Sequence, residues 1–329
     1  MLKQMKFKAT RQMLTLIGIC TLIFFSSVSH SQSWPDKTIK LIIPFAPGGT
    51  TDILGRILAQ QMGIILGQNI IVENRAGAGG NIGAEVVANA PPNGYTLLLA
   101  SGSMMTVNPF LYKKLPINYA KDLTYITAVA GGPMLLSVNP NLPVNNLKEF
   151  IALAKSKPLT FGSAGIGSQV HMAGESLTYA AGINATHVPY KGEAPAINDL
   201  VAGQIDFMVG NLPAAAGFAK TGQIKPIGIT SSKRVVQLPD VPTVSEAGIP
   251  GFFNVGWYAL AAPSETPKAI LDILYAATQK SLESEAMRKS LDLNGLTPIM
   301  NTSQELNQQI KNETANWEKV IKARNIQAQ

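Results

Sequence analysis

One stretch near the start of the chain constrains the fold more than any other. Residues 39–43 are largely apolar and suit a buried strand, and the loop that follows contains Pro44, Pro47, Gly48 and Gly49. Apolar residues then recur at every third or fourth position, which predicts an amphipathic helix over residues 50–66. These positions are Ile53, Leu54, Ile57, Leu58, Met62, Ile65 and Leu66, and Gly67 suits the C-terminal cap. A strand, a tight loop and a helix in this order indicate an α/β fold.

The loop before this helix has the properties of an anion-binding turn. Its prolines restrict the backbone, while Gly48 and Gly49 let N–H groups approach a ligand closely. Thr50, Thr51 or Asp52 is expected to cap the helix, whose N-terminus favours negative charge. The loop is therefore predicted to bind an anion without a cationic side chain. The alternative is an ordinary strand–helix connection that binds nothing.

Strands and helices alternate through the first third of the chain. After the opening unit, the pattern predicts strands over residues 69–72 and 95–99, with a helix over residues 81–89 between them. This alternation is typical of a parallel sheet covered by helices on both faces. Ser101 and Ser103 follow the third strand, at the edge where open α/β sheets bind their ligands.

The middle third repeats the alternation and predicts a second α/β unit. Its strands are expected over residues 135–138, 159–162, 187–190, 205–209 and 224–230. Another strand over residues 255–261 and three C-terminal helices are expected to return to the first unit. The predicted domains are therefore residues 32–131 with 255–329, and residues 132–254. The links between them are expected near residues 130–133 and 254–257.

Two glycine-rich loops resemble nucleotide motifs only superficially. Residues 162–167 have the glycine spacing of a P-loop, but Ser168 stands where the motif requires lysine. Residues 77–83 fail the dinucleotide fingerprint because Ile82 occupies the third glycine position. No cofactor is expected. The loop over residues 163–168 is interpreted as a site for a smaller anion or, alternatively, as a tight turn and helix cap.

Catalysis has weak support in the sequence. After residue 31 the chain contains only two histidines, His171 and His187, with no Gly-x-Ser-x-Gly elbow and no His-x-x-x-His pair. His171 is expected either to reach a ligand or to bond within the protein, and His187 is expected to be structural. Asp206 opens a strand and is expected either to contact a ligand amino group or to brace a loop. No metal site and no enzymatic activity are predicted.

The N-terminal residues predict export from the cytoplasm. Four basic residues precede an apolar run over residues 13–25, and Ser29-His-Ser31 offers a cleavage site, as in a secretory signal peptide. The alternative is a retained membrane anchor. The remaining 298 residues contain no cysteine and carry a net charge of +3, which favours a bacterial periplasm and argues against nucleic acid as a partner.

Several motifs, in order and over nearly all of the mature chain, resemble the Bug family, the TctC-like solute receptors of tripartite tricarboxylate transporters. The motifs are Ile42-Ile-Pro-Phe-Ala-Pro-Gly-Gly-Thr-Thr-Asp52, Glu73-Asn-Arg-Ala-Gly-Ala-Gly-Gly-Asn-Ile-Gly83, Asn93-Gly-Tyr-Thr-Leu-Leu98, Val188-Pro-Tyr-Lys-Gly192 and Leu238-Pro-Asp-Val-Pro-Thr-Val-Ser-Glu-Ala-Gly248. The resemblance implies a two-domain periplasmic binding protein of the type II-like Venus flytrap class, each domain a mostly parallel sheet flanked by helices.

The same resemblance implies that a small organic acid binds between the domains for uptake by the transporter's membrane permease. The chain is expected to be a monomer. The expected ligand-binding residues are Phe45, Ala46, Gly48, Gly49, Thr50, Asp52, Ser101, Ser103, Ser163, Gly167, Ser168, His171 and Asp206. The alternatives are a receptor that feeds a sensor kinase and a serine hydrolase that uses Ser163 or Ser168 with His171.

Overall fold

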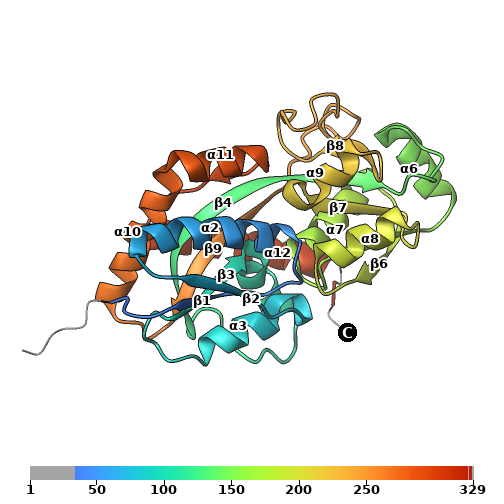
Figure 1. Cartoon of the computed structure of the whole chain (residues 1–329). Coiled ribbons are helices and arrows are strands. Elements are labelled where there is room, and N and C mark those ends of the chain that lie inside the picture. The colour runs from blue at the N-terminus through green and yellow to red at the C-terminus, as the bar shows by residue number, and fades with distance from the viewer. Residues whose placement is uncertain (1–33, 325, 328–329) are drawn as a thin grey trace, which may run out of the picture. The chain divides into compact units, whose positions relative to one another are not determined.

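The structure is a computed structural model that describes residues 34–324 and 326–327. The predicted signal peptide, residues 1–31, lies outside the described residues. The chain divides into two compact units, Met1–Asp36 and Lys37–Gln329. Every element described below belongs to the second unit (Figure 1).

Three parallel strands open this unit, as the alternation predicts. β1 (Ile39–Ile43) lies between β2 (Ile70–Asn74) and β3 (Thr96–Ser101). The connections are α2 (Thr50–Leu66) and, after a short 3-10 turn η1 (Ala78–Gly80), α3 (Asn81–Ala88). These helices lie on opposite faces of the strands (Figure 1), so the hydrophobic side chains of β1 are buried on both sides.

Helix α2 follows its sequence pattern except at its start. Leu54, Leu58 and Met62 are buried, and Gly67 ends the helix in the left-handed conformation. The predicted side-chain cap is wrong: the N-cap is Gly49, with no side-chain hydrogen bond. Asp52 instead accepts a hydrogen bond from the Gly48 N–H, which precedes the helix.

A second group of parallel strands forms the other end of the sheet. β5 (Leu159–Ser163) lies between β6 (Ala185–Pro189) and β7 (Phe207–Asn211). The helices of this region are α6 (Leu147–Ser156), α7 (Gln169–Ala181), α8 (Glu193–Val201) and α9 (Leu212–Lys220), and β8 (Lys225–Ile229) follows them. The predicted alternation is confirmed here, with element ends shifted by a few residues.

Two long antiparallel strands join these groups into one ladder. β4 (Leu123–Val138) and β9 (Val255–Pro263) pair with each other, and the strand order is β2-β1-β3-β9-β4-β7-β5-β6. Residues 123–133 of β4 pair with β9, whereas residues 134–138 pair with β7 and β8. We call β1, β2, β3, β9 and residues 123–133 the first sheet half, and residues 134–138 with β5–β8 the second sheet half.

The C-terminal helices return to the first sheet half, as the sequence predicts. α10 (Lys268–Glu283) and α11 (Glu285–Leu293) pack on α2, and α12 (Ser303–Arg324) packs on β4 and α4. α12 begins with a capping box: the Thr302 hydroxyl accepts from the Glu305 N–H, and the Glu305 carboxylate accepts from the Thr302 N–H. Elements that the sequence did not indicate are α4 (Gly102–Thr106), α5 (Asn108–Leu111) and β10 (Thr297–Pro298).

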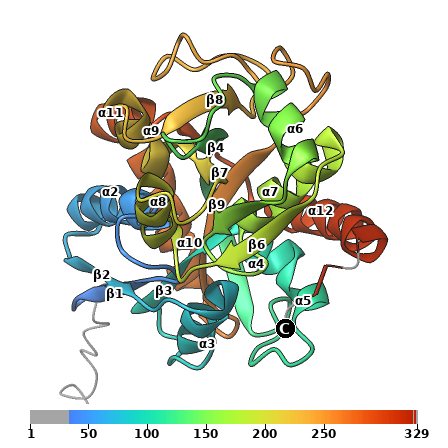
Figure 2. The same ribbon diagram turned by 90° about the vertical axis from the view of Figure 1, so that its right-hand side faces the viewer.

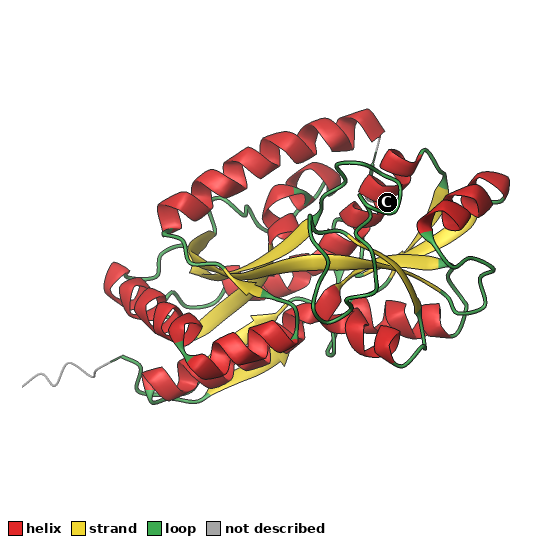
Figure 3. Ribbon diagram, turned by 90° about the horizontal axis from the view of Figure 1, so that it is seen from above, coloured by secondary structure: helices red, strands yellow, loops and turns green. Residues whose placement is uncertain are grey.

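Helices cover both faces of the ladder, as the view from above shows (Figure 3). Each sheet half has its own hydrophobic core. In the first half, buried hydrophobic side chains cluster around Leu98, Tyr125 and Ala259, and in the second half they cluster on opposite faces, around Phe161 and around Met208. Within the described residues, no helix has both the length and the apolar character needed to cross a lipid bilayer.

Candidate functional site

A small pocket lies where the two sheet halves meet, at the C-terminal ends of β1, β3, β5 and β7. Its lining residues are Phe45, Gly49, Thr51, Ser101, Ala164, Ser168, Gln169, Val170, Glu193, Asn211 and Tyr258. This is the edge at which open α/β sheets bind ligands. The cavity volume is about 20 Å³, which is room for a water molecule rather than an organic acid.

The structure brings only part of the predicted set to this pocket. Four of the predicted residues line it: Phe45, Gly49, Ser101 and Ser168. The others either lie in the same loops without lining the pocket or, in the case of Asp206, lie elsewhere. Seven lining residues were not predicted, and these include the charged residue Glu193 and the aromatic residue Tyr258.

Asp52 points away from the pocket and fixes the loop between β1 and α2. Its carboxylate accepts from the Gly48 N–H at 3.0 Å, from Arg56 at 2.9 and 3.0 Å, and from Asn74 Nδ2 at 2.9 Å. Burial raises the pKa of Asp52, but the hydrogen bonds from Arg56, Gly48 and Asn74 outweigh it and leave the pKa lowered. Asp52 therefore stays ionised, and the Gly48 N–H is already occupied by a protein acceptor.

The same loop bonds across to the second sheet half. The Ala46 N–H donates to the Lys191 carbonyl at 3.1 Å. The Thr50 N–H, in the first turn of α2, donates to Glu193 Oε2 at 2.7 Å. In Figure 2 the start of α2 lies beside α8, whose first residue is Glu193. The predicted anion position at this helix N-terminus thus holds a carboxylate that belongs to the protein.

Glu193 is buried without a cationic partner. Its side chain accepts three hydrogen bonds, from Thr50 N and, at 2.9 and 2.7 Å, from Asn211 N and Nδ2. Burial raises the pKa of Glu193, and these hydrogen bonds partly offset that effect. Nothing in the sequence indicated a buried carboxylate here, because an acidic residue at the first position of a helix is usually a surface feature.

Two buried hydroxyls beside Glu193 lack hydrogen bonds of good geometry. Within the described residues, neither Thr50 Oγ1 nor the Tyr258 hydroxyl has such a partner. Burial raises the pKa of Tyr258 well above 10, and the neighbouring Glu193 carboxylate raises it further, whereas the Thr50 hydroxyl lowers it. Unsatisfied buried hydroxyls are costly and uncommon in folded proteins, so this corner of the pocket has unused capacity for a polar ligand.

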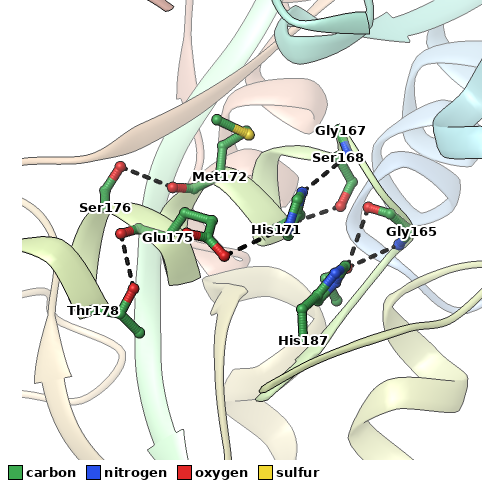
Figure 4. A network of polar contacts seen from close by, with 10 residues as sticks. Gly165, Gly167, Ser168, His171, Met172, Glu175, Ser176, Thr178 and His187 are labelled. Carbon is green, nitrogen blue, oxygen red and sulfur yellow. Dashed lines mark hydrogen bonds and ion pairs between the residues drawn. The ribbon is translucent and has the colours of Figure 1, made fainter. Parts of the chain in front are cut away.

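The Gly165 and Gly167 N–H groups of the loop between β5 and α7 are, by contrast, bonded within the same segment (Figure 4), while the Tyr112 hydroxyl donates to the Ile166 carbonyl of this loop at 2.8 Å. Ser163 Oγ accepts from the Gly165 N–H, and His171 Nδ1 accepts from the Gly167 N–H. The Ser168 hydroxyl caps α7 by accepting from the His171 N–H at 3.2 Å. The cap and the tight turn that the sequence offered as an alternative are therefore present. Of these residues only Ser168 also lines the pocket.

Behind this loop the two histidines stack on each other. Their ring centroids are 3.9 Å apart, and His187 Nε2 lies 2.6 Å from Ser163 Oγ. Burial, followed by the proximity of His187, lowers the pKa of His171 to about 3, and burial lowers that of His187 to about 4. Both rings are therefore neutral near pH 7.

The hydrolase interpretation named the wrong histidine for Ser163. The partner of Ser163 is His187, and His171 bonds the Gly167 N–H instead. Ser163 is 0% exposed and does not line the pocket. A nucleophile must reach its substrate, so the Ser163–His187 pair is better placed to hold the loop than to attack a ligand.

Asp206 lies at the opposite end of its strand from the pocket. Its carboxylate accepts from the backbone N–H and the hydroxyl of Thr160, at 2.8 and 3.0 Å. Residues that precede a strand meet the N-terminal edge of the sheet, whereas the pocket is at the C-terminal edge. The bracing role is therefore the one that the contacts of Asp206 support.

Gln169 connects the pocket to β9. Its side-chain amide accepts from the Trp257 N–H at 2.9 Å and donates to the Trp257 carbonyl at 3.0 Å, as a neighbouring strand would. The Trp257 ring packs against Gly102, where any Cβ would overlap it, and its indole N–H donates to Glu313 at 2.8 Å. Ser101 and Ser103, whose hydroxyls are 3.3 Å apart, flank Gly102.

Metal ligation has no support in this region. Within residues 34–324 and 326–327, no group of three or more histidine, cysteine, aspartate or glutamate side chains is placed to hold a metal ion. The pocket instead offers hydroxyls, amides and one carboxylate, which suit a small polar organic ligand.

Comparison with known proteins relates this geometry to one family. Residues 54–326 match the model of the tripartite tricarboxylate transporter family receptor, TctC. BugT of Bordetella pertussis is 34% identical over 316 residues, which are 94% of this chain and 97% of that protein.

Solved structures give the same result in three dimensions. R. palustris Rpa4515 with adipate is 34% identical, with a TM-score of 0.86 over 89% of this chain and 99% of the other. MatC from Rhodopseudomonas palustris with bound malate is 33% identical, with a TM-score of 0.82 over 88% and 100%. A TctC solute-binding protein from Polaromonas, solved with no ligand, is 30% identical over 88% and 100%, but its TM-score is 0.61. Sequence and fold agree that this chain belongs to the tripartite tricarboxylate transporter receptor family.

Proposed function

We propose that this chain is a periplasmic receptor that captures a small carboxylate-containing solute and delivers it to the membrane permease of a tripartite tricarboxylate transporter. The observation that carries the proposal is the pocket between the two sheet halves, lined from one side by Phe45 and Gly49 and from the other by Ser168 and Gln169. The adipate and malate in two related structures support an organic acid as the ligand.

We further propose that the chain folds into the two domains expected from its sequence, residues 32–131 with 255–329, and residues 132–254. The links would be neighbouring strand segments, because Gly131 pairs with Trp257, Gly132 with Gly256 and Pro133 with Val255. A cavity of about 20 Å³ admits no organic acid unless its walls separate, which supports hinge opening. The lower TM-score to the relative without ligand, at similar identity, fits two hinge positions.

Export, location and assembly belong to the same proposal. A signal peptide over residues 1–31 would place the mature protein, as a monomer, in the periplasm. The expected product begins at Gln32 or within a few residues of it. Intact-mass measurement of periplasmic material tests this, and recovery of a membrane form that keeps residues 13–25 would contradict it.

Small-angle scattering and thermal shift together test ligand capture. A thermal-shift screen of mono-, di- and tricarboxylates and amino acids should find compounds that raise the melting temperature, because a ligand that binds only the folded state stabilises it. At saturation with such a compound, the radius of gyration should fall as the domains close. A stabilising ligand that leaves the radius unchanged would contradict hinge closure, and the absence of any stabilising acid would contradict the proposed ligand class.

A further inference from the structure

Glu193 is the one charged side chain among the described residues that line the pocket. It is 4% exposed, and no ion pair of Glu193 occurs within the described part of the chain. All three of its hydrogen-bond donors are neutral amides, from Thr50 and Asn211. A buried carboxylate without a cation is costly unless something in the site balances it. The pocket therefore contains an acidic group without a cationic partner, which is unexpected where an acid is to bind.

The unused hydrogen-bonding capacity of the pocket is concentrated around this carboxylate. Two carboxylate oxygens offer about four acceptor positions, of which Glu193 uses three. The Tyr258 hydroxyl, at 1% exposure, lines the pocket and has no hydrogen bond of good geometry within the described residues. An ammonium group has three donors and one positive charge. One Glu193 oxygen and the Tyr258 hydroxyl oxygen supply two acceptors together with the opposite charge.

The remainder of the pocket suits the other end of such a ligand. Ser168 accepts from the His171 N–H, so its own O–H is available to donate to a carboxylate. Ser101 adds a second hydroxyl. These two hydroxyls favour an anion without adding a cation. The serine hydroxyls and the Glu193 carboxylate therefore prefer ligand groups of opposite charge.

We propose that Glu193 is a specificity-determining residue that makes this receptor select amino acids, with the ligand ammonium held at Glu193 and Tyr258, over acids of the same skeleton without an amino group. The inference rests on the proposed function and names the class of acid. An acid without an amino group would leave the Glu193 charge unbalanced. A second carboxylate placed in that corner would be repelled by Glu193.

Calorimetric titration of matched acids tests the inference. Aspartate and succinate share one skeleton and differ by the amino group, as do glutamate and glutarate, and alanine and propionate; malate replaces the amino group of aspartate by a hydroxyl. The wild-type protein should bind the amino member of at least one pair about tenfold or more tightly than its partner. Glu193→Gln should reduce that ratio to about one, mainly by weakening the amino acid.

Two further variants separate selectivity from a general loss of structure. Glu285→Gln is the matched control, because Glu285 is also the first residue of a helix but is exposed and lies outside the pocket; it should leave every ratio unchanged. Tyr258→Phe removes one acceptor and should weaken the amino acid several-fold while leaving the plain acid unchanged. If Glu193→Gln does not fold, the wild-type ratios and Tyr258→Phe still decide.

The possible failures are distinguishable. Equal or tighter binding of the plain acids by the wild-type protein would overturn the inference and leave the proposed function intact. A ratio that persists in Glu193→Gln would also overturn it, because selectivity would then arise elsewhere in the pocket. If a folded protein binds none of these amino acids and none of the plain acids, the proposed function and the inference are both contradicted.

Discussion

The two loops that line the pocket have the same strand–loop–helix arrangement, but their backbone N–H groups donate to different kinds of acceptor. In the loop from β1 to α2, the N–H groups of Ala46 and Thr50 donate across the pocket region to Lys191 and Glu193. In the loop from β5 to α7, the N–H groups of Gly165 and Gly167 donate to Ser163 and His171 of the same segment. The first loop should therefore respond to ligand and to opening, and the second should serve as a fixed wall.

Gly49→Val, in the loop between β1 and α2, should have the largest effect on ligand affinity. An added Cβ would lie 3.5 Å from Glu193 and 3.7 Å from the Ala46 carbonyl, an ordinary contact, but the two further methyl groups of valine would occupy the pocket. Ligand affinity should fall by about a hundredfold or more while the protein stays folded. Gly49→Ala is the matched control and should keep measurable affinity. Calorimetry in which the valine variant binds like wild type would place the site elsewhere.

The loop between β5 and α7, with the two histidines behind it, should lose stability in acid. The folded-state pKa values of about 3 for His171 and 4 for His187 lie below the ordinary value of 6.5, so the unfolded chain takes up protons first as the pH falls. The contribution of the two neutral histidines to the free energy of unfolding is present in full above about pH 6.5. It is lost progressively toward pH 4, by about 2–3 kcal/mol for His187.

His187→Gln sharpens this prediction, because glutamine can keep a hydrogen bond to Ser163 but cannot take up a proton in this range. Denaturant unfolding at several pH values should give a shallower decline for the variant between pH 6.5 and 4. Ligand affinity at pH 7.5 should be unchanged, since His187 does not line the pocket. An unaltered pH slope would show that the histidine pair does not determine acid sensitivity.

Asp52→Asn should destabilise the loop between β1 and α2 without changing the residues that line the pocket. The carboxylate accepts from Gly48, Arg56 and Asn74, and an asparagine would turn donors toward donors. We expect a loss of about 1–2 kcal/mol in the free energy of unfolding, with little change in affinity. Asp272→Asn is the control, since Asp272 makes the exposed ion pair with Lys268 and should matter little. A large fall in affinity for Asp52→Asn would assign the carboxylate to the site.

Ser168→Ala should give the smallest effect and separates capping from binding. Ser168 caps α7 and lines the pocket, whereas Ser284 caps α11 by accepting from the Met287 N–H, away from the pocket. Alanine at either position should cost about 1 kcal/mol of stability. Only Ser168→Ala should also weaken ligand binding, by a few-fold, in calorimetric titration. Equal affinities in both variants would remove Ser168 from the ligand contacts.

The sequence anticipates the local elements well and the long-range pairings poorly. Helices α2 and α6 follow from apolar periodicity, and Asn146 caps α6 as expected. The length of β4 was missed because its Gly131-Gly-Pro133 segment resembles a strand break. Only the partner strand β9 makes this stretch a central strand, and pairing between distant segments is not visible in local sequence.

The distinction between local elements and long-range pairings also explains which pocket residues could be predicted. Four of the predicted residues, Phe45, Gly49, Ser101 and Ser168, line the pocket because they follow strands, and parallel strands end at one edge of a sheet. Glu193 reaches the pocket only where the two sheet halves meet, and no motif marks a buried carboxylate at a helix start. Tyr258 reaches it through the pairing of β9 with β3, where it lies opposite Ser101. Asp206 does not line the pocket, and its position before a strand already favoured the bracing alternative.

The contacts of Trp257 place a fluorescent side chain between the pocket and α12. Its main chain is tied to Gln169 of the pocket, its ring packs on Gly102 beside Ser101, and its indole N–H is bonded to Glu313 of α12. The segment that holds it runs alongside Gly131 of β4, where the proposed domains meet. Movement between the halves, as proposed above, would alter the polarity around the Trp257 indole. In a variant that keeps Trp257 and replaces the other two tryptophans by phenylalanine, the emission maximum would then follow opening and closing.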